Sequence, residues 1–457
     1  MEHEILTPEE RFLKGKALRE KCSRNKHSEW NPSLRTWDPI TILENSNIDR
    51  IPGLVSIRYQ RMSQSPFTFF RGSAIIHARD LANSPVSGIT VQACGDCHLL
   101  NFGGFATPER SLAFDINDFD ETFPGPWEWD IKRLAVSFVL AARDLGFSKN
   151  ESEDAARQAV LSYRTKMSEF SKKSLLERWY EKITIENLIE AFGKNEGVLA
   201  RLRKAEKRAA SRTSEKLFPK LTNLQKEKPK IKDEPPLLYH LKNKELESRK
   251  NLEGYKKSLQ QDRRLLLERY ELVDSAIKVV GIGSVGSRCF VALFYANGSE
   301  PLFLQIKEAR RSILENPEGK SIYEHQGFRV VNGQRLMQAA SDIFLGWFQS
   351  ESGHDYYVRQ LHDMKIAPHI ESFKASDLVD YASMCGWALA RAHSKTGDAA
   401  MISGYLGSKD KFDEAVVKYA LSYADQVESD FKLFKKAIQA NTLKIKPKKE
   451  ELLDFDI

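Results

Sequence analysis

The sequence predicts an α+β fold in which an antiparallel sheet lies between groups of helices along the chain. The sheet is indicated within 271–370, where apolar and polar residues alternate along successive segments and the pair Asn297-Gly298 favours a tight hairpin turn. Helices are indicated at 377–394 and 411–439, where the apolar residues recur with helical spacing. At 457 residues the chain is too long for one small core, so several packed parts are expected.

Changes in composition divide the chain into six parts. A polar helical lead-in, irregular near its prolines, is followed by a compact apolar part that contains a helix over 130–146. A segment rich in Lys, Arg, Glu and Leu comes next and predicts a helical insertion with one irregular, proline-containing loop. The sheet, a second group of helices and a solvated tail complete the chain. The six parts are 1–50, 51–164, 165–270, 271–370, 371–440 and 441–457.

The composition argues against two kinds of partner. A net charge of +7 is modest for this length, so a nucleic-acid partner is not expected. The chain begins without an apolar segment typical of a signal peptide, and no run approaches 18 apolar residues, so no membrane association is expected. The five cysteines are odd in number and mostly scattered, which favours a reducing, cytoplasmic location over a disulfide framework.

The stretch CGDCHLLNFG, residues 94–103, allows three interpretations. Cys94, Cys97 and His98 spell the C-x-x-C-H pattern of haem attachment, but no export signal accompanies them, so no haem is expected. A zinc site would need a second Cys/His cluster, which the sequence lacks, so we expect ordinary reduced thiols in a buried loop. The third interpretation is a phosphotransferase loop, because Asp96 and Asn101 have the spacing of its base and its metal ligand.

Acidic residues are concentrated just after this stretch, in FDINDFDE at 114–121. Phe114, Ile116 and Phe119 alternate with the acids, as in a strand. So many carboxylates in an apolar segment would repel one another unless a cation neutralised them, and oxygen ligands favour Mg²⁺ or Mn²⁺. The residues of this constellation are Asp96, His98, Asn101, Asp115, Asp118, Asp120 and Glu121.

The second chemical signal is the glycine-rich stretch from Gly281 to Gly286. A strand follows it rather than the helix that a dinucleotide-binding fold requires, so the Rossmann interpretation fails. A glycine-rich hairpin that closes over phosphates fits better, and the next strand then supplies Lys307 to pair with phosphate oxygens.

Taken together, these motifs resemble the protein-kinase-like superfamily, in particular the aminoglycoside and choline phosphotransferases. GDCHLLN resembles that branch's HGDxHxxN loop, with Cys94 in place of its histidine, and NDFDETFPGPWEWDIKRL resembles its IDFxDxxxGxxxxDLxRL segment. The set SPFTFFRG, GDCHLLNFG, NDFDET and PWEWD also resembles an uncharacterised bacterial family placed near these kinases, over most of the chain from about 50 to 400.

The order of the motifs departs from that of ordinary kinases, in which the glycine loop precedes the catalytic loop. Here the catalytic loop lies at 95–101 and the glycine loop at 281–286. LARAHS, 389–394, resembles the kinase helix that normally runs into the catalytic loop. The resemblance therefore implies a bilobal, circularly permuted kinase-like fold, with the 51–164 and 371–440 parts in the larger lobe and 271–370 as the nucleotide lobe.

The resemblance also implies roles for individual residues. Asp96 would be the base for the acceptor hydroxyl, Asn101 and Asp118 would hold Mg²⁺, and Asp115 competes with Asp118 for that role. Lys307 would neutralise nucleotide phosphates, with Glu324 or Gln334 as its partner. Asp130 would buttress the catalytic loop. Residues expected to meet the nucleotide are Gly281, Gly283, Ser284, Gly286, Gln360, Leu361 and His362.

Several residues near these motifs have no assigned role. His98, Asp120 and Arg71 are either substrate contacts or structural residues. The kinase pattern does not explain Arg58, Arg61 and Arg71, which bind an anionic substrate or pair with the carboxylates; a structural role is slightly favoured.

The expected function is ATP- and Mg²⁺-dependent phosphoryl transfer to a hydroxyl acceptor, which we take to be a small molecule that the sequence does not name. Transfer of AMP on the same fold is the first alternative. A metallohydrolase using Asp96, His98 and Asp118 is the second, although it leaves Lys307 without a task. A nucleotide-binding pseudoenzyme is the third.

Overall fold

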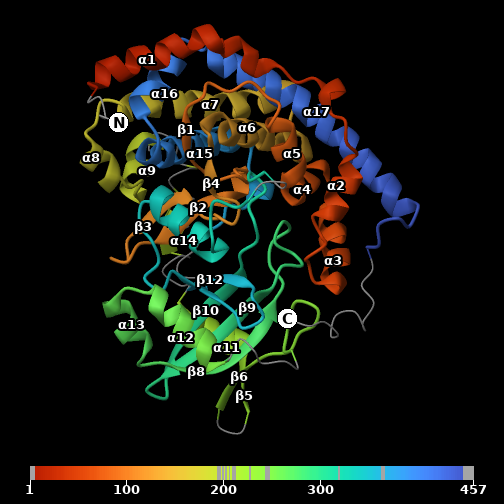
Figure 1. Ribbon diagram of the computed structural model, residues 1–457, viewed down its shortest axis with the longest axis vertical. Coiled ribbons are helices and arrows are strands. Elements are labelled where there is room, and N and C mark those ends of the chain that lie inside the picture. Colours follow the sequence, from red (N-terminus) through yellow and green to blue (C-terminus); the bar gives the residue numbers. More distant parts are fainter. Residues whose placement is uncertain are drawn as a thin grey trace.

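A computed structural model describes residues 6–192, 213–225, 228–241, 248–316, 320–361 and 366–445, with isolated positions between 197 and 207. Most of the helices gather in one half of the molecule, and a six-stranded sheet lies in the other half with the few helices that pack against it (Figure 1). The predicted α+β class is confirmed. No helix within these ranges is long and apolar enough to cross a membrane.

The main sheet is antiparallel throughout, as the alternating sequence predicts. Asn297 and Gly298 turn between two of its strands with φ of 50° and 70°, the conformation of a tight primed hairpin turn. In spatial order its strands are β11 (Gly346–Gln349), β12 (Asp355–Gln360), β10 (Glu300–Glu308), β9 (Cys289–Ala296), β8 (Glu271–Lys278) and β7 (Leu238–Tyr239).

The segment before this sheet is not wholly helical. Its helices are α8 (Leu175–Tyr180), α9 (Ile185–Phe192), α11 (Ser214–Leu221), α12 (Arg249–Ser258) and α13 (Gln261–Leu267). The irregular loop expected here is wrong: β5 (Thr222–Gln225) and β6 (Lys228–Ile231) form a hairpin, and β7 joins the main sheet. Pro229 lacks an N–H, but a strand of a two-stranded ribbon has a free edge that tolerates it.

The helical half is built around long helices with buried faces. The predicted helices are confirmed as α6 (Trp127–Asp144), α15 (Ala375–Thr396) and α17 (Lys411–Gln439). α7 (Lys149–Phe170) packs on α15 so closely that a Cβ on Gly386 would lie 2.2 Å from the Ala159 carbonyl oxygen. The remaining helices here are α1 (Pro8–Lys21), α2 (Pro39–Asn45), α3 (Pro52–Met62), α4 (Pro66–Gly72), α5 (Ala74–Leu81) and α16 (Ala399–Leu406).

Two small two-stranded sheets lie between the helices and the main sheet (Figure 1). β1 (Thr90–Ala93) pairs with β4 (Phe123–Pro126), and β2 (Phe102–Ala106) pairs with β3 (Leu112–Ile116). α14 (Gln326–Met337) also lies in this region (Figure 1). The connection from β1 to β2 carries most of CGDCHLLNFG, and the acidic segment begins on β3 and continues into the connection to β4.

Candidate functional site

Two adjoining cavities lie between the two halves of the molecule. The first, of about 300 Å³, is lined by Asp96 and the loop that follows it, and the second, of about 270 Å³, by Lys307 and the sheet. Asp118, Gly281 and Ser284 line both cavities. The structure therefore brings the two sequence motifs to one site.

The loop that carries Asp96 is held from below by Asp130. Its carboxylate accepts the backbone N–H of Cys94 at 2.6 Å and that of Gly95 at 3.0 Å. His393, at the end of α15, lies with Nε2 3.1 Å from the same carboxylate. Gly95 has φ of 85°, a conformation that side chains disfavour. Asp130 thus lies where a residue that buttresses the loop is expected.

Asp96 is fixed at the edge of the first cavity. Arg133 reaches its Oδ1 with Nε at 2.8 Å and a terminal nitrogen at 2.7 Å. The side chain is 20% exposed, so it still faces the cavity. The Asn101 amide donates to the Asp96 backbone carbonyl at 2.7 Å, which places both predicted residues on one turn.

His98 is neutral in the folded protein. It is 4% exposed, and burial lowers the pKa of its imidazole to about 3. Its Nδ1 is buried and has no hydrogen-bond partner among the described residues. His98 also lines the first cavity, so it offers an uncharged nitrogen there.

Buried histidines are expected to make the protein less stable as the pH falls below about 6.5. Burial also lowers the pKa of His27 to about 3. The unfolded chain therefore takes up the proton first, and each such histidine costs up to about 1.4 kcal/mol of unfolding free energy per pH unit between about 6.5 and 3. Urea unfolding at pH 6.5 and 5.5 measures this slope. His27→Gln, remote from the cavities, should reduce the slope by up to that amount, and an unchanged slope would contradict the expectation.

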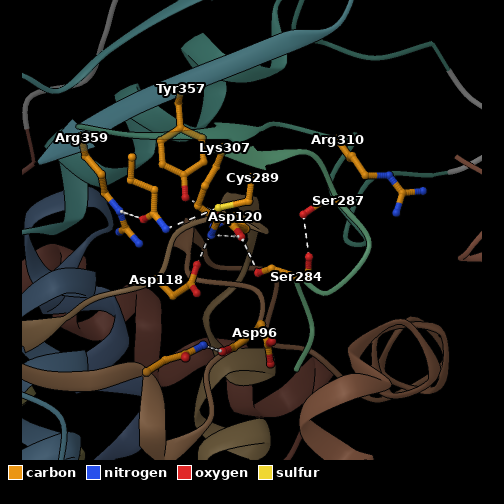
Figure 2. A network of polar contacts seen from close by, with 12 residues as sticks. Asp96, Asp118, Asp120, Ser284, Ser287, Cys289, Lys307, Arg310, Tyr357 and Arg359 are labelled. Atoms are coloured by element: carbon orange, nitrogen blue, oxygen red, sulfur yellow. Dashed lines mark hydrogen bonds and ion pairs between the residues drawn. The ribbon is translucent and has the colours of Figure 1, made fainter. Parts of the chain in front are cut away.

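The acidic turn after β3 meets the sheet at Lys307. Lys307 Nζ lies 2.5 Å from Asp120 Oδ2, the Tyr357 hydroxyl donates to Asp120 Oδ1 at 2.5 Å, and Ser284 Oγ donates to Oδ2 at 3.2 Å. Figure 2 shows these side chains pointing toward one another, with Asp118 beside them and Asp96 on the opposite side of Ser284. The Asp120 N–H donates to Asp118 Oδ1 at 3.2 Å, which fixes the two carboxylates relative to each other.

Both members of the Lys307–Asp120 pair are charged. Burial alone would raise the pKa of Asp120, but Lys307 outweighs it and lowers that pKa. Burial alone would lower the pKa of Lys307, but the charge of Asp120 raises it well above its usual value. A buried pair of this kind is favourable only with close contact and further hydrogen bonds, which Tyr357 and Ser284 supply.

The expectation that Glu324 or Gln334 partners Lys307 is wrong. Glu324 is exposed ahead of α14, and Gln334 donates to Gln338 at 2.9 Å. Lys307 instead points at a turn 187 positions earlier in the chain. Sequence spacing around the lysine gives no sign of so distant a partner.

Asp115 lies apart from both cavities. It is fully buried, accepts two contacts of 2.9 Å from one Arg391 nitrogen, and accepts the Ala339 N–H at 2.8 Å. Asp115 lies within β3, where its side chain is buried in the core, whereas Asp118 comes after the end of that strand. The arrangement therefore favours Asp118 over Asp115 as a metal ligand.

The glycine-rich stretch forms a hairpin turn between antiparallel β8 and β9, so it does not open a dinucleotide-binding helix. Gly281 and Gly286 have φ of 69° and 93°. A Cβ on Gly283 would lie 3.9 Å from Asp96 Oδ2, so the turn passes directly over the predicted base.

Arginines that the sequence left without a role hold this region together. Arg61 donates to the Gly281 carbonyl at 2.5 Å. Buried Arg58 donates to the Gly72 carbonyl at 2.6 Å. Both arginines thus hold main-chain segments in place, but neither forms an ion pair with a carboxylate of the described residues. Arg71 lines the first cavity.

The predicted adenine contacts lie along the second cavity. Gln360 and Leu361 line it, but their N–H groups donate within the protein, to the Asp342 carboxylate and to the Phe303 carbonyl respectively. His362 lies outside the described residues. These two N–H groups are therefore not available to an adenine in this cavity.

Sequence reasoning missed three residues of the site. Tyr357 lies opposite Lys307, and Arg359 opposite Gln305, in the β10–β12 register. Arg359 lines the second cavity. Because alternate residues share a face, the register would have identified both once Lys307 was chosen. Arg329 of α14, fully buried, donates to the carbonyls of Asp120, Thr122 and Arg310 and had no sequence signal.

The donor set fits Mg²⁺ better than a structural metal. Among the described residues no group of three or more His, Cys, Asp or Glu is arranged to hold a metal. Asn101 and Asp118 both line the first cavity, and Mg²⁺ is commonly held by one or two protein ligands together with phosphates and water. Cys94 and Cys97 are buried free thiols, as predicted.

Comparisons with known proteins place the chain in a family. Searches of curated proteins and of solved structures found no match. A family model described as "Uncharacterized protein conserved in bacteria (DUF2252)" matches residues 50–437. This range covers most of the chain, all of the second cavity's lining and all of the first cavity's lining except Ser46, and the protein therefore belongs to that bacterial family.

Proposed function

We propose that this protein is an ATP- and Mg²⁺-dependent phosphotransferase with a kinase-like, circularly permuted fold that acts on a hydroxyl of a small molecule. The observation that carries the proposal is the meeting of Asp96 and Asp118 at one cavity with Lys307 at the adjoining one. Phosphoryl transfer needs little covalent work from a protein, but it needs positioned charges around the phosphates.

In this proposal the nucleotide binds in the second cavity and the acceptor hydroxyl lies at Asp96 in the first. The second cavity receives the nucleotide, with Lys307 and Arg359 facing its phosphates. Asp96 accepts the proton of the acceptor hydroxyl, whose oxygen bonds to the γ-phosphorus as the bond to the β–γ bridging oxygen breaks and ADP leaves. Asn101 and Asp118 would hold Mg²⁺, which when bound neutralises charge on the phosphates.

The end of α15 supports the permuted kinase-like arrangement. Thr396 Oγ1 accepts the Gln92 N–H at 3.2 Å, and a Cβ on Gly397 would lie 2.5 Å from Val91 Cγ1. The helix ending LARAHS thus stops beside β1, the strand that runs into the Asp96 loop. In an unpermuted kinase the chain would continue there.

The proposal is tested by ATP turnover with Asp96→Asn. This variant should keep the Mg²⁺-dependent thermal stabilisation by ATP, because Asp96 lies on the acceptor side, and should lower ADP release by about 10²- to 10⁴-fold, the usual contribution of a general base. ADP, AMP and pyrophosphate are measured with a panel of hydroxyl compounds, and Asp144→Asn, at an exposed position of α6, is the matched control.

Three outcomes would count against the proposal. ATP without any thermal effect would remove the nucleotide site. ADP release that is unchanged in Asp96→Asn would remove the assigned base. Pyrophosphate in place of ADP would replace phosphoryl transfer by AMP transfer on the same residues.

A further inference from the structure

Two arginines of the first cavity have no hydrogen bond or ion pair with the part of the chain that the structure describes. Four of its arginines donate within the protein: Arg50 to the Val285 carbonyl at 2.7 Å, Arg58 to that of Gly72, Arg310 to that of Ser46 at 3.2 Å, and Arg311 to the Glu315 carboxylate at 3.1 Å. Arg71 and Arg79 line the same cavity, and neither forms a hydrogen bond or an ion pair with any described residue.

Arg71 is partly buried at the end of α4. Its Nε is inaccessible to solvent and unpartnered within the described chain, and its guanidinium lies 5.7 Å from the Phe67 ring centroid. Burial lowers the pKa of Arg71, and attraction to Asp96 and Glu371 offsets only part of that effect. A buried cation without hydrogen bonds is costly, and a bound anion would satisfy it.

The acids of this cavity do not supply that anion, because most of them already have partners. Asp96 contacts Arg133, Asp120 contacts Lys307, and Glu308 contacts Arg288 at 3.2 Å. Glu315 pairs with Arg311, and Glu121 accepts the Ile313 N–H at 2.8 Å. The side of the first cavity that Arg71 and Arg79 line therefore carries positive charge that these carboxylates do not neutralise.

Two further features of this wall favour an anion. α5 begins between the two arginines, and Ala74 and Ile75 of its first turn line the cavity. Ser73 makes no side-chain cap, so the positive end of the helix is not neutralised by its own cap. Buried His98, with an unpartnered Nδ1, lines the same cavity beside Asp96.

We propose that the acceptor carries an anionic oxygen group, a phosphate or a carboxylate, which Arg71 and Arg79 bind while the acceptor hydroxyl faces Asp96. This inference rests on the proposed function for the identity of the ligand as an acceptor. Guanidinium groups suit both anions, since their planar donors match two oxygens at once. Neutral and cationic hydroxyl compounds would leave both arginines unsatisfied.

The experiment compares probes that share a skeleton and differ in charge. Binding of glycerol 3-phosphate, glycerate and glycerol to the full-length protein is measured by calorimetry, with and without a non-hydrolysable ATP analogue and Mg²⁺, and each probe is then tested as acceptor for ADP release. We expect one or both anions to bind at least about tenfold more tightly than glycerol, and Arg71→Gln and Arg79→Gln each to weaken that binding about tenfold or more.

Matched variants separate charge loss from general damage. Arg311→Gln lines the same cavity but removes an arginine that is already paired, so anion binding should change less than about threefold. Arg71→Lys should restore part of the lost affinity. If Arg71→Gln fails to fold, Arg79→Gln carries the test.

The outcomes distinguish this inference from the proposed function. Anion binding that is equal in wild type and both glutamine variants, or no tighter than that of glycerol, overturns the inference even if ATP is turned over. Arginine-dependent anion binding without ATP binding supports the anion site and overturns the phosphotransferase proposal. Glycerol 3-phosphate and glycerate tell a phosphate site from a carboxylate site.

Discussion

Asp118→Asn is expected to abolish the Mg²⁺-dependent part of ATP binding and to lower turnover by about a thousandfold or more. The substitution keeps the shape of the side chain and removes the negative charge of a residue that lines both cavities. A loss of this size follows because charge neutralisation is most of the catalysis in phosphoryl transfer. Thermal shifts with ATP, with and without Mg²⁺, and ADP release from wild type and variant are the measurements.

Asp115→Asn is the informative comparison for this experiment. Asp115 is the rival acid from the same segment, but it is fully buried against Arg391 and lines neither cavity. Its substitution should lower the melting temperature and leave the Mg²⁺ dependence of ATP binding intact in the folded fraction. If the two variants exchanged these effects, the metal would have to be assigned to Asp115.

Asp120→Asn is expected to destabilise the protein by about 3 kcal/mol or more. The variant removes the carboxylate that contacts the ammonium of Lys307 at 2.5 Å, and removing one partner of a buried ion pair typically costs about 3–5 kcal/mol; Lys307 is 2% exposed. Urea unfolding at neutral pH measures the difference. ATP turnover should fall as well, because Lys307 would lose the contact that fixes it.

A double-mutant cycle tests whether this cost comes from the pair. Lys307→Met removes the positive charge that loses its contact in Asp120→Asn. The double variant should therefore be less destabilised than the sum of the two single variants. Additive effects would contradict the account. Wild type should also lose this contribution when the pH falls below about 4, since the pKa of Asp120 is lowered in the folded state and protonation favours the unfolded chain.

Local patterns predicted the parts of the fold that depend on neighbouring residues. Alternation located the strands from β8 to β12, and helical spacing located α6, α15 and α17. The hairpin of β5 and β6 was missed because Pro229 is normally a sign against a strand, whereas its place in a two-stranded ribbon makes it harmless.

The residues of the candidate site that lie in one sequence motif could be predicted, whereas those brought together from distant segments could not. Asp96, Asn101 and Asp118 stand within one short segment and line one cavity. The contact of Lys307 with Asp120 and the support that Arg329 gives the acidic turn arise only when distant segments fold together. A buried arginine that donates to carbonyl oxygens has no spacing rule by which a sequence could reveal it.

Arg329 has a consequence for how the two halves of the molecule can move. Its guanidinium joins the turn at Asp120 and Thr122 to Arg310, which follows β10. Since β10 also carries Lys307, these bonds and the contacts of Asp120 with Lys307 and Tyr357 tie the acidic turn to the sheet. If the two halves separate to admit and release ligands, we expect the distance between Lys307 and Asp120 to be preserved.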